Sequence, residues 1–214
     1  MAITWTEENA FQERINTWTH AFGFLLSIPA GGALVSLGLQ KSSPMALACV
    51  IYAASLSAMY LFSTLSHAVQ SPDLRHRIRS LDQGFIYALI AGTFTPLIVA
   101  FLEPGMCLGM LFFVWLSAAI GFYSKVFSKH RIDNMASLSY LLLGWIPAMV
   151  LMGFVPIYCF SWMLLGGVLY SVGVWFLQND HRSLFHHAIW HIAVIVASGC
   201  HYVAIWVFAA TTST

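Results

Sequence analysis

The chain has 214 residues, of which 59% are hydrophobic, 15% aromatic and 8% charged, and its formal net charge is +1. A soluble globular domain usually carries about 25% charged residues, so this chain cannot cover a surface that faces water. The composition predicts a single domain over residues 1–214 that lies almost entirely in a membrane, after a short polar segment over about residues 1–14. The net charge is too balanced to suggest that the protein binds a nucleic acid.

Seven apolar segments are long enough to be transmembrane helices, since about 20 apolar residues cross about 30 Å of hydrocarbon. They cover residues 15–39, 44–69, 81–102, 105–126, 135–154, 156–177 and 185–211. Short stretches with charged or turn residues separate them, for example QSPDLRHRIRS and QNDHRS. The predicted fold class is therefore an all-α integral membrane protein, a bundle of seven transmembrane helices.

The basic residues indicate how this bundle is oriented. With seven spans, one side of the membrane carries Arg14, Arg75, Arg77, Arg79, Lys125, Lys129, Arg131 and Arg182. The other side carries Lys41 alone. Because loops rich in Lys and Arg face the cytoplasm, the N-terminus is predicted to be cytoplasmic and the C-terminus to lie outside.

The first two spans contain polar side chains that share faces of their helices. Glu13, Asn16 and His20 are spaced i, i+3, i+7 near the start of the first span. Ser63 and His67 are spaced i, i+4 at the end of the second span. Ionisable groups within a span are costly, so they point to a functional site.

The third and seventh spans begin with ionisable residues as well. Asp82 is the only carboxylate of the third span, and His187 and His191 lie one turn apart in the seventh. The second span ends on the cytoplasmic side, where the first, third and seventh begin. We therefore expect Asp82, His187 and His191 to lie at the same depth as His20 and His67.

This set of side chains suits a metal ion. Two imidazoles at i, i+4 and a third from a neighbouring helix form three sides of a tetrahedron, and a catalytic zinc site keeps its fourth position for water. The predicted Zn²⁺ ligands are His67, His187 and His191. Zinc lowers the pKa of its bound water from 15.7 to about 7. Asp82 could then accept a proton or hold the water, and Ser63 could hydrogen-bond the water or a polarised substrate oxygen.

Each of these residues also has a simpler interpretation. A histidine near a membrane interface is commonly just interfacial, and an HxxxH spacing arises easily by chance among nine histidines. Asp82 could only cap the third helix, and Ser63 could bond the carbonyl one turn back. Among the other histidines, we expect His186 to be interfacial and His201 to be a hydrogen-bonded interior residue. The remaining ones lie in charged loops: His76, His130 and His181.

Four segments resemble, in this order, the signature segments of the haemolysin III family: ERINTWTHAFG, STLSH, LDQGFIYALIAGTFTP and HHAIWHIAVIVASGCHYVAI. That family is a bacterial branch related to the progestin and adipoQ receptors and, more distantly, to the alkaline ceramidases. The resemblance extends from about Glu13 to Ile205. It implies a multi-pass protein of the bacterial inner (plasma) membrane, with zinc near the cytoplasmic side.

The same resemblance implies roles for individual residues. It implies zinc ligands at His67, His187 and His191, a water-linked acid at Asp82, and the serine of the SxxxH motif at Ser63. It leaves Glu13, Asn16 and His20 as neighbours that support the ligands.

The activities of the related branches differ, so the resemblance leaves several functions open. We expect a zinc-dependent hydrolase of lipid amides or esters, which takes a lipid or fatty-acyl substrate from the bilayer. The alternatives are a non-enzymatic receptor-like or membrane-homeostasis protein with structural zinc, and a lytic or pore-forming protein. A bis-histidine haem is a further alternative, but it needs ligands on facing helices at matched heights, which His187 and His191 on one helix do not supply.

Overall fold

The computed structural model describes residues 7–127 and 133–211, with side chains over residues 10–127 and 137–211. Lys129 and Arg131, which contribute to the predicted orientation, lie outside the described residues, as does His130. The other basic residues that are predicted to face the cytoplasm lie at or near helix ends that are close to one another. We call this end of the bundle the basic end.

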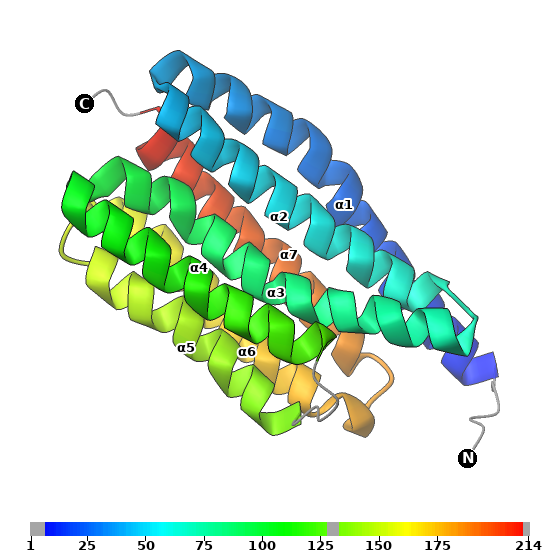
Figure 1. Ribbon diagram of the computed structural model, residues 1–214. Coiled ribbons are helices and arrows are strands. Elements are labelled where there is room, and N and C mark those ends of the chain that lie inside the picture. Colours follow the sequence, from blue (N-terminus) through cyan, green and yellow to red (C-terminus); the bar gives the residue numbers. More distant parts are fainter. Residues whose placement is uncertain (1–6, 128–132, 212–214) are drawn as a thin grey trace.

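Seven α-helices make up almost all of the described chain (Figure 1). They are α1 (Glu7–Lys41), α2 (Ser43–Ala68), α3 (Pro72–Phe101), α4 (Pro104–Val126), α5 (Asp133–Leu151), α6 (Ile157–Gln178) and α7 (His186–Ala204). Six of them are long and apolar enough to cross a membrane, and α5 contributes a shorter apolar stretch, Ser137–Leu151. The seven-helix, all-α fold of a multi-pass integral membrane protein is confirmed.

Two helices begin well before the spans that hydropathy predicts. The helix α1 starts at Glu7 rather than at residue 15, and α3 starts at Pro72 rather than at residue 81. Hydropathy marks only the part of a helix that lies in hydrocarbon, so it misses a charged extension into water. Pro at the first helical position and an acid in the first turn, Asp73, both favour a helix start at this point.

The helix α7 lies within the bundle and positions the residues of its first turns. It packs against α6 and α1, and its π-helical continuation η2 (Ile205–Ala210) packs against α3 and α1. Figure 1 shows that α1, α3 and α7 begin, and α2 ends, toward the same end of the molecule. This is the basic end, so the polar residues predicted to share one depth are brought to one level.

Glycines allow α1 and α2 to pack closely. A Cβ atom added at Gly31 would lie 2.8 Å from Ala53 Cβ, and one added at Gly38 would lie 2.9 Å from Ala46 Cα. Small residues let transmembrane helices approach until their backbones are nearly in contact. The same device joins α6 to α7, where Gly166 packs on His201 and Gly173 packs on Trp190.

This packing predicts how glycine substitutions in α1 affect stability. Gly38→Val should destabilise the protein by about 1–3 kcal/mol, because the backbone of α2 at Ala46 cannot move aside as a flexible side chain would. Gly32→Val is the matched control, since a Cβ at Gly32 has no neighbour within 4 Å. Thermal unfolding of the purified protein measures both. Equal melting temperatures for the two variants would contradict close packing of α1 on α2.

Candidate metal centre

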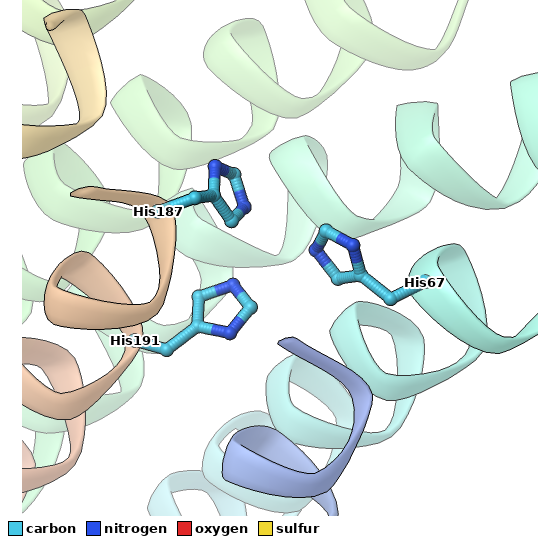
Figure 2. Close-up of side chains that lie close together, drawn as sticks. All are labelled: His67, His187 and His191. Carbon is cyan, nitrogen blue, oxygen red and sulfur yellow. The ribbon is translucent and has the colours of Figure 1, made fainter. Parts of the chain in front are cut away.

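Three histidines converge at the basic end of the bundle. His67 comes from the last turn of α2, and His187 and His191 come from the first two turns of α7. One ring nitrogen of each lies within 4.8 Å of one ring nitrogen of the other two. The ring centroid of His67 is 5.0 Å from that of His187 and 5.1 Å from that of His191. Figure 2 shows the three imidazoles turned toward a common point, so this cluster could hold a metal ion.

Contacts to the Nδ1 atom of each ring leave Nε2 for a ligand. His67 Nδ1 lies 2.6 Å from Glu13 Oε2, and His187 Nδ1 lies 3.6 Å from Asp180 Oδ2. Metal-binding histidines nearly always donate their other N–H to a carboxylate, a backbone carbonyl or water, which fixes the tautomer. Glu13 provides that hydrogen bond for His67. Asp180 lies at ion-pair distance from Nδ1 of His187, which favours a proton on that nitrogen.

His191 obtains the same orientation from α1. Its Nδ1 lies 3.2 Å from the carbonyl oxygen of Asn16 and 3.0 Å from Thr19 Oγ1. The Thr19 hydroxyl donates its own proton to the Asn16 carbonyl at 2.9 Å, so it accepts a proton from His191. His191 Nδ1 is therefore a donor, and its Nε2 carries the lone pair that a metal needs. The chemistry of all three rings fits a metal ion.

Asp180 lies in the short 3₁₀ turn η1 (Asp180–Arg182) that leads into α7. Its interaction with the His187 imidazole, whose Nδ1 lies 3.6 Å from Asp180 Oδ2, holds the pKa of this carboxyl below its usual range. A carboxylate that stays ionised is a constant acceptor for the imidazole N–H. The turn thus orients His187 from outside the membrane-spanning helices.

Asp82 and Ser63 lie on the wall of a cavity that His187 and His191 also line. Ser63 is buried, and Asp82 accepts a hydrogen bond at Oδ2 from Ser66 Oγ at 3.0 Å. Ser66 Oγ also lies 2.9 Å from the carbonyl oxygen of Ser63, so its single hydroxyl proton is shared between these two acceptors. The carboxylate that sequence analysis selects therefore lies beside the histidines, with one oxygen fixed by α2.

This cavity has a volume of about 420 Å³ and follows α7 from His187 to His201. Those two residues are 14 positions apart on α7, so the cavity extends about 21 Å into the membrane at 1.5 Å per residue. Away from the histidines its wall is mainly apolar, with side chains of α3, α5 and α6 such as Leu89, Ile90, Phe94, Leu141, Phe160 and Met163. A narrow apolar cavity with a polar end is thus attached to the candidate metal centre.

The other polar residues of the sequence analysis lie around this centre in different ways. Glu13 contacts His67, whereas Asn16 contributes its backbone rather than its side chain. His20 stacks on His191 with ring centroids 3.7 Å apart, and both of its ring nitrogens are buried without a hydrogen-bond partner. His201 is buried and bonds the Ala197 carbonyl, as predicted for an interior residue.

Three supporting residues were missed from the sequence: Thr19, Ser66 and Asp180. Ser66 directly precedes His67, and Asp180 lies in the predicted loop before the seventh span. A search for a hydrogen-bond acceptor near each proposed ligand would have included Asp180. Thr19 gives no such signal, because its role depends on how α1 is rotated against α7.

Comparison with known proteins places this arrangement in one family. The family described as "Haemolysin-III related" matches residues 9–202. The chain is 32% identical over 209 residues to Hemolysin-3 of Bacillus cereus, covering 94% of each chain. It is 33% identical over 198 residues to a Hemolysin-3 homolog of Bacillus subtilis, covering 89% of this chain and 91% of that one.

A human protein is also similar. The monocyte to macrophage differentiation factor of Homo sapiens is 34% identical over 205 residues, which cover 92% of this chain and 84% of the human one. The family match over residues 9–202 therefore spans nearly the whole helical bundle.

The contact between Glu13 and His67 makes a prediction for metal affinity. Glu13→Gln should weaken binding of a divalent metal about 10–100-fold, because an uncharged amide is a poorer acceptor for the imidazole N–H. Competition with a chelator of known affinity measures the change. Glu103→Gln, an exposed carboxyl at the start of α4, is the control. Equal affinities in the two variants would contradict the role of Glu13.

Proposed function

The chain belongs to the haemolysin III-related family, and we propose that it is a zinc-dependent membrane hydrolase that cleaves an amide or ester bond of a lipid. The observation that carries this proposal is the largely apolar cavity that reaches His187 and His191, two of the three convergent histidines, with Asp82 and Ser63 on the same wall. A purely structural ion has no need of an adjoining cavity of about 420 Å³.

The choice of zinc rests on the donor set. Three neutral imidazoles with fixed tautomers suit a borderline-soft ion that has no demanding geometry of its own. In this proposal His67, His187 and His191 hold the ion through Nε2. When bound, zinc would supply an acidified water and polarise a carbonyl group.

The protein's own residues supply proton transfer and orientation. Asp82 accepts a proton at Oδ1, while the hydrogen bond from Ser66 to Oδ2 holds the carboxylate in place. A general base that is positioned in this way contributes about 10²–10⁴-fold to a rate. Ser63 donates a hydrogen bond from its hydroxyl to the carbonyl oxygen of the substrate. Asp82 later passes the proton that it took from the attacking water to the leaving amine or alkoxide.

The lining of the cavity indicates the class of substrate. Its apolar wall accepts a hydrocarbon chain, which leaves the scissile carbonyl at the polar end beside the histidines. The cavity follows α7 for about 21 Å, a length that suits an extended hydrocarbon chain. Exclusion of bulk water from this wall strengthens the electrostatic interactions at the polar end.

A second candidate is a non-enzymatic protein in which the metal joins helices. The three ligands connect α2 with α7, and Glu13, Asn16 and Thr19 add α1 to the same junction. Such a clamp explains the convergence of the rings without any reaction. It leaves the role of the adjoining cavity unexplained.

Asp82→Asn distinguishes the two candidates. A hydrolase should lose at least about 100-fold in turnover of a lipid amide such as a ceramide, because the Asn side chain cannot accept the proton that the Asp82 carboxylate accepts. Metal content should stay the same, since Asp82 is not a proposed ligand. Asp73→Asn, an exposed carboxyl on the same helix, is the control and should retain full activity.

Two results would contradict the hydrolase. One is wild-type protein with a full complement of metal and no turnover of lipid amides or esters. The other is turnover that survives both removal of the metal and the Asp82→Asn change. The first result leaves the structural clamp as the account of the centre.

A further inference from the structure

His201 lines the long cavity at a distance from the candidate metal centre. It lies ten positions after His191 on α7, so it is about 15 Å deeper in the membrane at 1.5 Å per residue. Its side chain is buried, and the proposed reaction does not use it. A polar ring inside a membrane span is costly, and such a residue points to a functional role.

The helix α7 itself fixes one nitrogen of this ring. His201 Nδ1 lies 3.0 Å from the carbonyl oxygen of Ala197, one turn earlier in the same helix. A carbonyl oxygen can only accept, so the neutral ring carries its proton on Nδ1. Nε2 therefore carries a lone pair, which can accept a hydrogen bond and cannot donate one.

This lone pair borders the cavity. His201 Nε2 forms no hydrogen bond with the described part of the chain. In that part of the chain, the side-chain N and O atoms that lack a partner and are closed off from open space belong to Asn16, His20 and Gln83. Since His201 Nε2 is not one of these closed-off atoms, it faces open space, and the open space beside this ring is the cavity.

The other polar side chains in the same stretch of the cavity already use their donors on the protein. Thr93 donates to a backbone carbonyl oxygen at 2.7 Å, and Trp145 donates to a serine hydroxyl at 3.1 Å. The hydroxyl of Tyr170 is 2.7 Å from Ser198 Oγ. A donor that satisfies His201 Nε2 therefore has to come from whatever fills the cavity.

Close packing holds the ring in its place. A Cβ atom added at Gly166 would overlap His201 at Nδ1 and Cε1, so the ring lies directly against the backbone of α6. The ring of Tyr170 lies beside it, with ring centroids 5.7 Å apart. The position of Nε2 is thus set by two helices, which gives the cavity a fixed polar point among mainly apolar side chains.

We propose that His201 Nε2 accepts a hydrogen bond from a hydroxyl group on the hydrocarbon chain of the bound lipid, so that the cavity selects hydroxylated acyl chains. A hydroxyl is a small group that gives such a chain a donor, whereas a double bond or a ketone gives it none. Elsewhere in hydrocarbon the hydroxyl finds no partner, so the pairing favours both groups. The inference rests on the proposed function in one respect: the carbonyl end of the lipid lies beside His187 and His191.

The depth of His201 indicates where the hydroxyl lies on the chain. An extended alkyl chain advances about 1.25 Å per carbon, because C–C bonds of about 1.5 Å meet at angles of about 111°. The distance of about 15 Å along α7 then corresponds to about twelve carbons from the carbonyl group. A hydroxyl on the second carbon lies too far from His201 to reach it.

The test compares two fatty acids as ligands of the full-length, metal-loaded protein in detergent. Competition with tritiated octadecanoic acid gives the affinities for 12-hydroxyoctadecanoic acid and for unlabelled octadecanoic acid. The ratio of the two affinities is compared between variants, which cancels the different partitioning of the two acids into detergent. His201→Phe should lower this ratio about two- to ten-fold, the effect of one net hydrogen bond. His186→Phe changes a histidine of α7 that does not line the cavity, so it should leave the ratio as in the wild type.

A pair of glycine variants tests the same contact while the imidazole stays in place. Gly166→Ala crowds the His201 ring and should also lower the ratio, because it displaces Nε2. Gly144→Ala is the matched control: Gly144 lines the same cavity, and a Cβ there meets nothing within 4 Å. This pair decides the question if His201→Phe fails to fold.

The position of the hydroxyl provides a further control. 2-Hydroxyoctadecanoic acid carries its hydroxyl next to the carboxylate, so its affinity relative to octadecanoic acid should be the same in His201→Phe and in the wild type. An equal ratio for 12-hydroxyoctadecanoic acid in the wild type, His201→Phe and Gly166→Ala would overturn the proposal and leave Nε2 with water as its partner. Because binding is measured without any reaction, absent turnover would contradict the hydrolase alone.

Discussion

The bundle depends on hydrogen-bonded partners for most of the ionisable side chains that lie at one level of its otherwise apolar interior. A charged or strongly polar group inside a membrane span is costly unless it finds partners. Here His67, Asp82 and His191 come from three different helices, and their partners Glu13, Ser66 and Thr19 come from α1 and α2. Each pair between two helices fixes their relative rotation and depth. The same contacts that make the ionisable groups tolerable therefore align α1, α2, α3 and α7.

The alignment produces two sites on either side of one pair of residues. The long cavity reaches His187 and His191 along α7, and a second hollow reaches Glu13 and His67 between the start of α1, the end of α2 and the start of α3. The bonded pair of Glu13 and His67 separates them. A substitution at Glu13 should therefore affect both the long cavity and the second hollow.

The sequence contains enough information for the fold class and for much of the site. Hydropathy locates the helices because hydrocarbon demands long apolar stretches, and it fails at the start of α3 because a helix can continue into water. The distribution of Lys and Arg among the loops indicates which helix ends lie on the same side of the membrane, and so it predicts that His67 and His187 lie at the same depth. The partners Thr19, Ser66 and Asp180 depend on helix rotation and on the short turn η1. Neither property has a signature in composition or spacing.

The central claim is that His67, His187 and His191 hold one zinc ion through their Nε2 atoms. X-ray absorption at the zinc edge of the purified full-length protein tests it most directly. The account predicts about one zinc per chain, with three imidazole nitrogens at about 2.0–2.1 Å and one light-atom ligand. A protein purified without any first-row metal, or a zinc with sulfur ligands at about 2.3 Å, would contradict it.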